Sequence, residues 1–227
     1  VYGVRCYETP TAAALDCDAL LLSVKPQQMR EACQPLAPFL QQQLVISIAA
    51  GLRLDDLSRW LGDYRKIVRA MPNTPALIGA GITGLCAMPA VSMAERLGAE
   101  RILQAVGSTL WLAEEEQMDA VTAVSGSGPA YVFLFIEALQ QGALELGLSP
   151  VQARQLSIDT VLGAARLAAQ SDEAPATLRQ RVTSKGGTTE AALHTMAERG
   201  VKEGFIAGIA AARARGRELG ELLGKDA

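Results

Sequence analysis

Leu44-Val-Ile-Ser-Ile-Ala-Ala-Gly51 is a short apolar run that ends on two alanines and a glycine. Two similar runs flank it in the sequence, over residues 18–24 and 66–71. Continuous apolar runs of this length are typical of parallel strands that are covered on both faces. Stretches of helical character, residues 27–40 and 54–61, separate the three runs. The sequence therefore predicts a βαβ succession, which builds a doubly wound parallel sheet.

The rest of the chain divides into a short α/β part and a long helical part. Strands are expected over residues 81–86 and 109–112, on either side of a helix over 92–106. After Ala113 no further strand pattern is present, and the helical stretches are residues 130–146, 150–170, 176–181 and 190–223. We therefore expect an α/β domain over residues 1–113 and an all-α domain over residues 114–227.

Composition excludes several classes of protein. The chain has 227 residues, 49% of them hydrophobic and 20% charged, with a net charge of −3. These values do not fit a disordered chain or a generally basic nucleic-acid binder, so no nucleic-acid partner is expected. Neither a membrane partner nor a metal site is expected. No contiguous apolar run approaches the roughly 18 residues of a membrane span, and one histidine with four cysteines lacking a CxxC pair makes a poor ligand set.

Unusual residues follow each of the first three expected strands. They are Ser23-Val-Lys-Pro26, Ala49-Ala-Gly51 and Pro72-Asn-Thr-Pro75. In an open parallel sheet, ligands bind outside the carboxyl ends of the strands. Taken singly, the three segments also fit a surface lysine, close strand–helix packing and an Asx turn. Taken together, they favour a crevice for a planar or phosphorylated ligand.

Two glycine-rich segments lie in the helical half. Each is expected to form a turn before a helix: Ser125-Gly-Ser-Gly-Pro-Ala-Tyr131 and Thr183-Ser-Lys-Gly-Gly-Thr-Thr-Glu190. In the second, the backbone amides at Gly186 and Gly187 carry no side-chain cover and would point toward an anion such as a carboxylate. A plain helix cap is the alternative for both segments.

A dinucleotide-binding sheet normally opens with a GxGxxG turn between its first strand and helix. The sequence from Val1 contains no such turn before the first expected strand. We therefore expect that a first βαβ portion of roughly 40 residues belongs before Val1.

These motifs resemble, in order and over nearly the whole chain, the pyrroline-5-carboxylate reductase family. The matching segments are Val24-Lys-Pro-Gln27, Ala49-Ala-Gly51, Met71-Pro-Asn-Thr-Pro75, Ser125–Tyr131 and Thr183–Thr189. The resemblance implies a Rossmann-like domain, incomplete at its amino end, followed by a helical domain for dimerisation and substrate binding. It also implies a cytoplasmic NADPH- or NADH-dependent oxidoreductase of proline biosynthesis that reduces 1-pyrroline-5-carboxylate. Its homodimers would have interlocked helical domains and often assemble further.

The resemblance also implies roles for individual residues. Gly187, Thr188 and Thr189 would hold the substrate carboxylate through backbone amides, and the Thr189 hydroxyl would bond the ring nitrogen as the catalytic contact. Glu115 would lie near the substrate. The residues implied for the cofactor are Ser23, Val24, Lys25, Pro26, Ala49, Ala50, Gly51, Asn73, Arg181 and Val182.

Two rival interpretations remain open at this stage. One is a related two-domain 3-hydroxyacid dehydrogenase, which would use a lysine of the helical domain as proton donor. Lys185 is the only candidate for that lysine in a comparable loop. The other is a non-catalytic dimerisation fragment, which the lack of a GxGxxG turn would favour.

Overall fold

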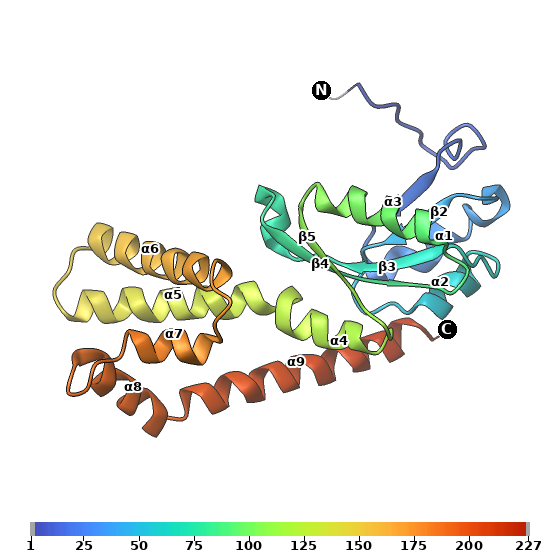
Figure 1. Ribbon diagram of the computed structural model, residues 1–227. Coiled ribbons are helices and arrows are strands. Elements are labelled where there is room, and N and C mark those ends of the chain that lie inside the picture. Colours follow the sequence, from blue (N-terminus) through green and yellow to red (C-terminus); the bar gives the residue numbers. More distant parts are fainter. Residues whose placement is uncertain (1–2, 226–227) are drawn as a thin grey trace. The chain divides into compact units, whose positions relative to one another are not determined.

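The computed structural model describes residues 3–225, in which one sheet has the strand order β1-β2-β3-β4-β5 (Figure 1). The strands are β1 (Ala19–Leu22), β2 (Leu44–Ser47), β3 (Ile67–Met71), β4 (Gly81–Ala87) and β5 (Gly107–Trp111). All five coincide with runs that the sequence identified as strands. The order follows the chain, because each strand pairs with the one that precedes it.

The sheet is mixed. β1, β2 and β3 are parallel, β4 is antiparallel to β3, and β5 is parallel to β4. The expectation of a fully parallel sheet is therefore corrected at β4. Only the short 3₁₀ helix η3 (Thr74–Ile78) connects β3 to β4, and a parallel connection needs a crossover of a dozen or more residues.

Helices cover both faces of the sheet. Figure 1 shows α3 (Met93–Gln104) on one face, opposite α2 (Leu54–Trp60). The helix expected over 27–40 is broken into η1 (Pro26–Gln28), α1 (Met29–Cys33) and η2 (Ala37–Phe39). Pro35 and Pro38 explain the break, since proline has no amide to donate and its ring clashes with the preceding helical turn.

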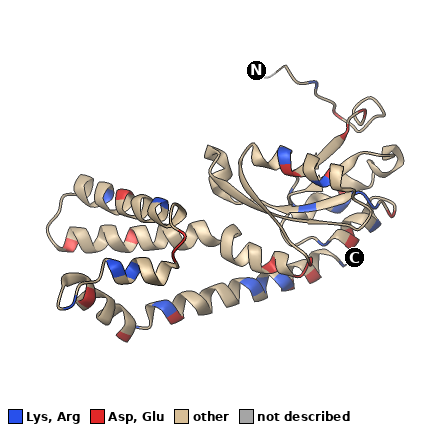
Figure 2. Ribbon diagram, in the orientation of Figure 1, with Lys and Arg blue, Asp and Glu red and all other residues tan. Residues whose placement is uncertain are grey.

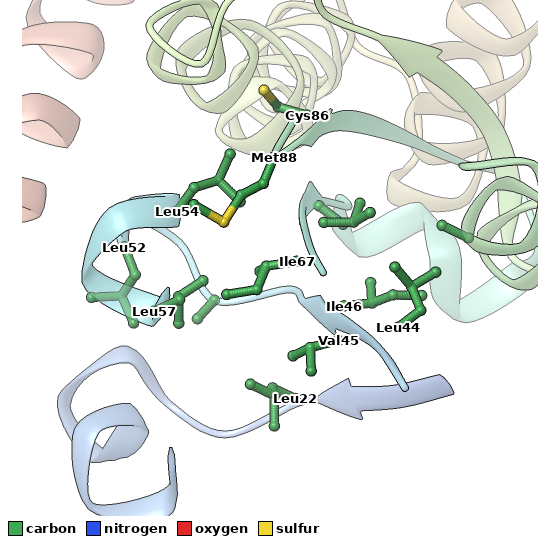
Figure 3. Close-up of a cluster of buried hydrophobic side chains, with 14 of the residues drawn as sticks. Leu22, Leu44, Val45, Ile46, Leu52, Leu54, Leu57, Ile67, Cys86 and Met88 are labelled. Carbon is green, nitrogen blue, oxygen red and sulfur yellow. The ribbon is translucent and has the colours of Figure 1, made fainter. Parts of the chain in front are cut away.

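The hydrophobic core lies around β2 and β3. All four residues of β2 are buried, and Val45, Ile46, Ile67 and Val68 have no exposed surface. Figure 3 shows these strands with Leu52 and Leu57, which come from α2 and the segment before it. Burial on both faces explains why β2 is a continuous apolar run instead of an alternating one.

The second half of the chain is helical. Its elements are α4 (Gln117–Val121), the π-helix η4 (Thr122–Gly126), α5 (Gly128–Glu145), α6 (Pro150–Ala169), α7 (Pro175–Arg181), α8 (Thr188–Glu198) and α9 (Val201–Leu223).

Two expectations for this half were wrong. The segment Ser125–Tyr131 is not a turn, because the chain remains helical through η4, where the Ser127 amide donates to the Thr122 carbonyl at 2.8 Å. The wider π turn accommodates Pro129, which has no amide of its own. The single helix expected over 190–223 is two helices, since Gly200 adopts a left-handed conformation (φ +65°) that ends α8.

The chain forms two compact units. The sheet unit comprises residues up to Pro129 together with the end of the chain from Ala210, and the helical unit comprises Ala130–Ile209. The end of α9 therefore belongs with the sheet. The domain boundary expected after Ala113 stays a prediction.

The helical segment Gln117–Glu145 is long and apolar enough, by length and composition alone, to cross a membrane. Contiguous apolar runs in the sequence did not identify this segment, because polar residues interrupt it. Figure 2 shows how few charged residues α5 carries. Its Phe133 and Leu134 side chains are more than 60% exposed in the single chain. A helix that another subunit covers has the same composition.

Glu95 fixes the start of α3 and provides a pH test of the fold. Its carboxylate accepts from the Ser92 hydroxyl at 2.7 Å and the Ser92 amide at 2.8 Å, and it pairs with Lys66 at 2.9 Å. The Ser92 hydroxyl first, and then Lys66, lower the pKa of Glu95 to about 2. Because the folded-state pKa is depressed, the stabilisation is present at neutral pH and is lost as the pH falls from about 4.5 to about 2.

We therefore expect Glu95→Gln to lower the free energy of unfolding by about 1 kcal/mol at pH 7. Urea unfolding at pH 7 and at pH 3 measures the difference, which should shrink at the lower pH. Glu31→Gln, at an exposed position of α1, is the control. A difference that is the same at both pH values would contradict this assignment.

Candidate functional site

The first three strands end at the same edge of the sheet. β1 and β2 are in register from Ala19 opposite Leu44 to Leu22 opposite Ser47, and β2 continues in parallel register with β3. The segments that follow these strands are residues 23–26, 49–51 and 72–75. The structure therefore brings the three segments together, as their positions in the sequence indicated.

The segment after β1 is open to solvent. Ser23, Val24 and Lys25 are exposed, and Lys25 has an extended backbone (φ −61°, ψ 145°). Pro26 begins η1 directly after it, which confirms the expected strand–lysine–proline–helix order. An ammonium group at the carboxyl edge of a parallel sheet is suited to a phosphorylated ligand.

The segment after β2 offers almost no side chain. Ala49 is buried, Ala50 is exposed, and Gly51 adopts a left-handed conformation with φ +83°. A residue with a Cβ would be strained at that φ. The backbone is thus the main surface that this segment presents to a ligand.

The segment after β3 is held by Asn73. Its side-chain nitrogen Nδ2 donates to the Ser125 carbonyl at 3.1 Å, and its oxygen Oδ1 accepts from the Ile82 amide at 3.0 Å. A Cβ placed on Gly126 would lie 2.7 Å from the terminal methyl carbon of Met71, so Met71 packs closely against Gly126. Asn73 therefore connects the end of β3 to β4 and to the π-helix, and its role toward a cofactor stays a prediction.

Glu115 joins three elements of the sheet unit. Its Oε1 accepts from Arg69 Nη1 at 2.9 Å and from the Leu54 amide at 2.8 Å. Arg69 lies within β3 and is 3% exposed, whereas Leu54 begins α2. The resemblance implied a place near the substrate for Glu115, and that stays a prediction. What the structure shows is an ion pair between the buried Arg69 guanidinium and the partly exposed Glu115 carboxylate, which also accepts from the first amide of α2.

Sequence reasoning missed Arg69. A signal for it is present, because Arg69 is the one charged residue inside the otherwise apolar strand Ile67–Met71. Charged groups are almost never fully buried without a partner, so an arginine in such a strand indicates a carboxylate nearby.

The second candidate position is the start of α8. Gly187 is the N-cap of α8, and no side chain caps the helix. The Gly187 amide donates to the Ser184 carbonyl at 3.0 Å, and the Gly186 amide donates to the Glu190 carboxylate at 2.6 Å. These two amides are thus paired within the turn, which differs from the expectation that they point at an anion. Within residues 3–225, the Thr188 and Thr189 amides donate to no protein acceptor.

Arg181 and Val182 lie at and just after the end of α7, before this turn. Arg181 forms an ion pair with Glu173 at 2.6 Å, and Val182 is 62% exposed. Their expected role in cofactor binding stays a prediction.

Conventional nucleophiles and metal ligands do not converge at either position. Burial raises the pKa of the Cys33 thiol to about 11, and the pKa of Cys86 is also raised, chiefly by burial. His194 is on the surface, 3.4 Å from Glu198. Across residues 3–225, no three histidine, cysteine or acidic side chains form a group that would hold a metal ion.

Comparison with known proteins places this geometry in a family. Residues 115–219 match the family model described as pyrroline-5-carboxylate reductase dimerisation, and residues 1–51 match the one described as NADP oxidoreductase, coenzyme F420-dependent. The pyrroline-5-carboxylate reductase of Pseudomonas aeruginosa is 48% identical over 225 residues, which cover 99% of this chain and 82% of that protein. The chain belongs to the pyrroline-5-carboxylate reductase family.

Solved structures of the family agree with the fold. The pyrroline-5-carboxylate reductase of Coxiella burnetii has a TM-score of 0.86 at 45% identity, over 91% of this chain and 77% of that one. The pyrroline carboxylate reductase of Plasmodium falciparum, solved with NADP bound, has a TM-score of 0.85 at 31% identity, over 93% and 81%. The fold is thus the α/β sheet with a helical dimerisation region that the sequence predicted.

The Glu115 contacts lead to a stability prediction. Glu115→Ala leaves the buried Arg69 guanidinium and the Leu54 amide without their shared acceptor. We expect the free energy of unfolding to fall by about 2–3 kcal/mol.

Urea unfolding measures this loss, with Glu116→Ala, at an exposed neighbouring position, as the control. Unchanged stability together with weakened substrate binding would make Glu115 a substrate ligand and not a structural acceptor.

Proposed function

We propose that this chain is an NAD(P)H-dependent 1-pyrroline-5-carboxylate reductase that forms L-proline. Family membership supports the proposal, and so does the start of α8, where a turn with two glycines leads into a helix whose first two amides, those of Thr188 and Thr189, donate to no acceptor within residues 3–225. The proposal is an oxidoreductase acting on a cyclic imine. It rests on two features, each within its own unit: a helix start suited to an anion in the helical unit, and a strand edge suited to a nucleotide in the sheet unit.

The substrate carboxylate would bind at the first turn of α8. The amides of Thr188 and Thr189 are free of protein acceptors within the described chain, and the positive end of the helix dipole favours an anion there. Gly187 contributes in a different way from its expected amide contact. A Cβ on Gly187 would lie 2.5 Å from the Ser184 hydroxyl and 3.1 Å from the Ser184 carbonyl oxygen, so a side chain at this position would require Ser184 to shift.

The cofactor would bind at the carboxyl edge of β1–β3. The residues of this edge fit a dinucleotide, since Lys25 is exposed for a phosphate and Ala50 and Gly51 leave the backbone accessible. Ser23, Val24 and Pro26 complete the surface, and the buried Ala49 precedes Ala50 in the same segment. When bound, the reduced nicotinamide supplies the hydride. The protein's part is to hold the ring at this edge while the other contacts orient the imine.

The chemistry needs little acid catalysis from the protein. A protonated imine is already a strong electrophile, so the site has to orient it and not to protonate it. The Thr189 hydroxyl, on a half-buried side chain, would bond the ring nitrogen and fix its orientation. The raised pKa values of Cys33 and Cys86 and the surface position of His194 agree with a mechanism that uses none of them.

A second copy of the chain would cover α5. Phe133, Leu134 and Phe135 are 65%, 62% and 42% exposed and point in different directions around the helix, so α5 leaves much apolar surface in water in the single chain. The match of residues 115–219 to a dimerisation model favours a homodimer with interlocked helical domains over a membrane as the covering surface. We also propose a cytoplasmic location, which the free thiols of Cys6, Cys17, Cys33 and Cys86 support.

We expect the chain to sediment as a dimer. Phe133→Glu should shift it toward monomer, because a carboxylate buried in an apolar interface is strongly unfavourable. Analytical ultracentrifugation measures the change, and Gln141→Glu on the same helix is the control. A monomer with the native sequence would contradict the proposed dimer.

The activity test is the oxidation of NADPH in the presence of 1-pyrroline-5-carboxylate, compared with NADP⁺ reduction in the presence of a 3-hydroxy acid. We expect turnover with the imine only. Turnover with the hydroxy acid alone would favour the dehydrogenase interpretation and Lys185, and binding of neither substrate would favour a non-catalytic role.

In the same assay, Thr189→Val removes one hydroxyl at nearly constant volume. We expect kcat/KM to fall about tenfold, equivalent to about 1.4 kcal/mol, the scale of one oriented hydrogen bond. Thr188→Val keeps its backbone amide and is the matched control. If the two variants have equal kinetics, Thr189 has no part in orienting the ring nitrogen.

A further inference from the structure

The last turn of α9 packs directly on the segment that follows β2. Gly220 is buried, and a Cβ placed on it would lie 2.6 Å from the carbonyl oxygen of Gly51. A Cβ placed on Gly51 would in turn lie 3.6 Å from the Gly220 amide nitrogen. The two backbones therefore touch with no side chain between them, and only glycine at position 220 permits this approach.

The contact continues one helical turn later. A Cβ on Gly224 would collide with the Asp56 carboxylate. The Gly224 carbonyl accepts from Arg59 Nη2 at 2.8 Å, and the same nitrogen pairs with Asp56 at 3.0 Å. Between the two glycines, Leu223 packs against the core cluster of the sheet unit. Gly220 and Gly224, which directly follows α9, are four residues apart and lie on the same side of the chain, Gly220 against Gly51 and Gly224 against Asp56 of α2.

These contacts hold one side of a segment whose other side is held by Glu115. The Leu54 amide donates to Glu115, and three residues earlier the Gly51 backbone meets Gly220. Gly51, which has a left-handed backbone conformation, is the residue that meets Gly220. The path of the chain from β2 into α2 is thus set from both directions by residues far away in the sequence.

We propose that the last turn of α9, through Gly220 and Gly224, is a positioning element for the cofactor-binding segment Ala49-Ala-Gly51. This inference rests on the proposed function. Where a segment reaches its binding conformation only part of the time, the apparent affinity falls by that fraction. The α9 contact raises the fraction, so it acts on cofactor binding and not on the substrate carboxylate at α8.

The test compares Gly220→Ala with Gly216→Ala. Both glycines are in α9, and a Cβ on Gly216 would meet nothing within 4 Å. Each substitution replaces glycine with alanine, a better helix former, so the difference between the variants isolates the contact with Gly51.

Three measurements distinguish positioning from general stability. They are NADPH affinity by fluorescence titration without substrate, the separate KM values for NADPH and 1-pyrroline-5-carboxylate, and hydrogen exchange of the amides in residues 48–54. We expect Gly220→Ala to bind NADPH about tenfold more weakly, with faster exchange in 48–54 and an unchanged KM for the imine. Gly216→Ala should match the native chain in all three. Gly224→Ala should weaken NADPH binding by a smaller factor, because the Asp56 side chain can move aside. This variant replaces Gly220→Ala in the test if Gly220→Ala does not fold.

Equal NADPH affinity in the Gly220, Gly224 and Gly216 variants would overturn the inference and leave the proposed function standing. Weakening of NADPH and imine binding by the same factor would also overturn it, since that result indicates general loss of structure. A native chain that binds no NADPH at all would overturn the proposed function, and this inference with it.

Discussion

One carboxylate oxygen connects the interior of the sheet to the start of α2. Glu115 Oε1 accepts from Arg69, buried in β3, and from the amide that opens α2. A buried guanidinium without an anion is costly, so β3 tolerates Arg69 only with this partner in place. The same oxygen satisfies an otherwise unpaired helix amide. The path of the chain out of β2, and therefore the exposed backbone of Ala50 and Gly51, depends on this shared acceptor.

The parts of the structure that sequence predicted are those set by local chemistry. Buried strands such as β2 appear as continuous apolar runs because both faces are covered. Pro26 marks the start of η1, since its fixed φ suits the first position of a helix. The three segments at the carboxyl edge follow from strand direction, and the family resemblance supplied the roles of individual residues.

The parts that were missed depend on contacts between distant residues. The reversal of β4 depends on the length of the connection through η3, and the π turn at Thr122–Gly126 depends on the position of one proline in a helical context. Gly186 looked available to an anion, but its amide is taken by Glu190, four residues later. Gly220 gave no signal at all, because its importance lies in the Gly51 backbone that it touches.

The exposed apolar side chains of α5 have a consequence for how the protein persists in a cell. Where these side chains are covered only by another copy, conformational stability is linked to protein concentration by mass action. A chain at low abundance would spend more time as a separate subunit, open to proteases and to aggregation. The expression level of such an enzyme would then govern how long each molecule survives, as well as how many molecules there are.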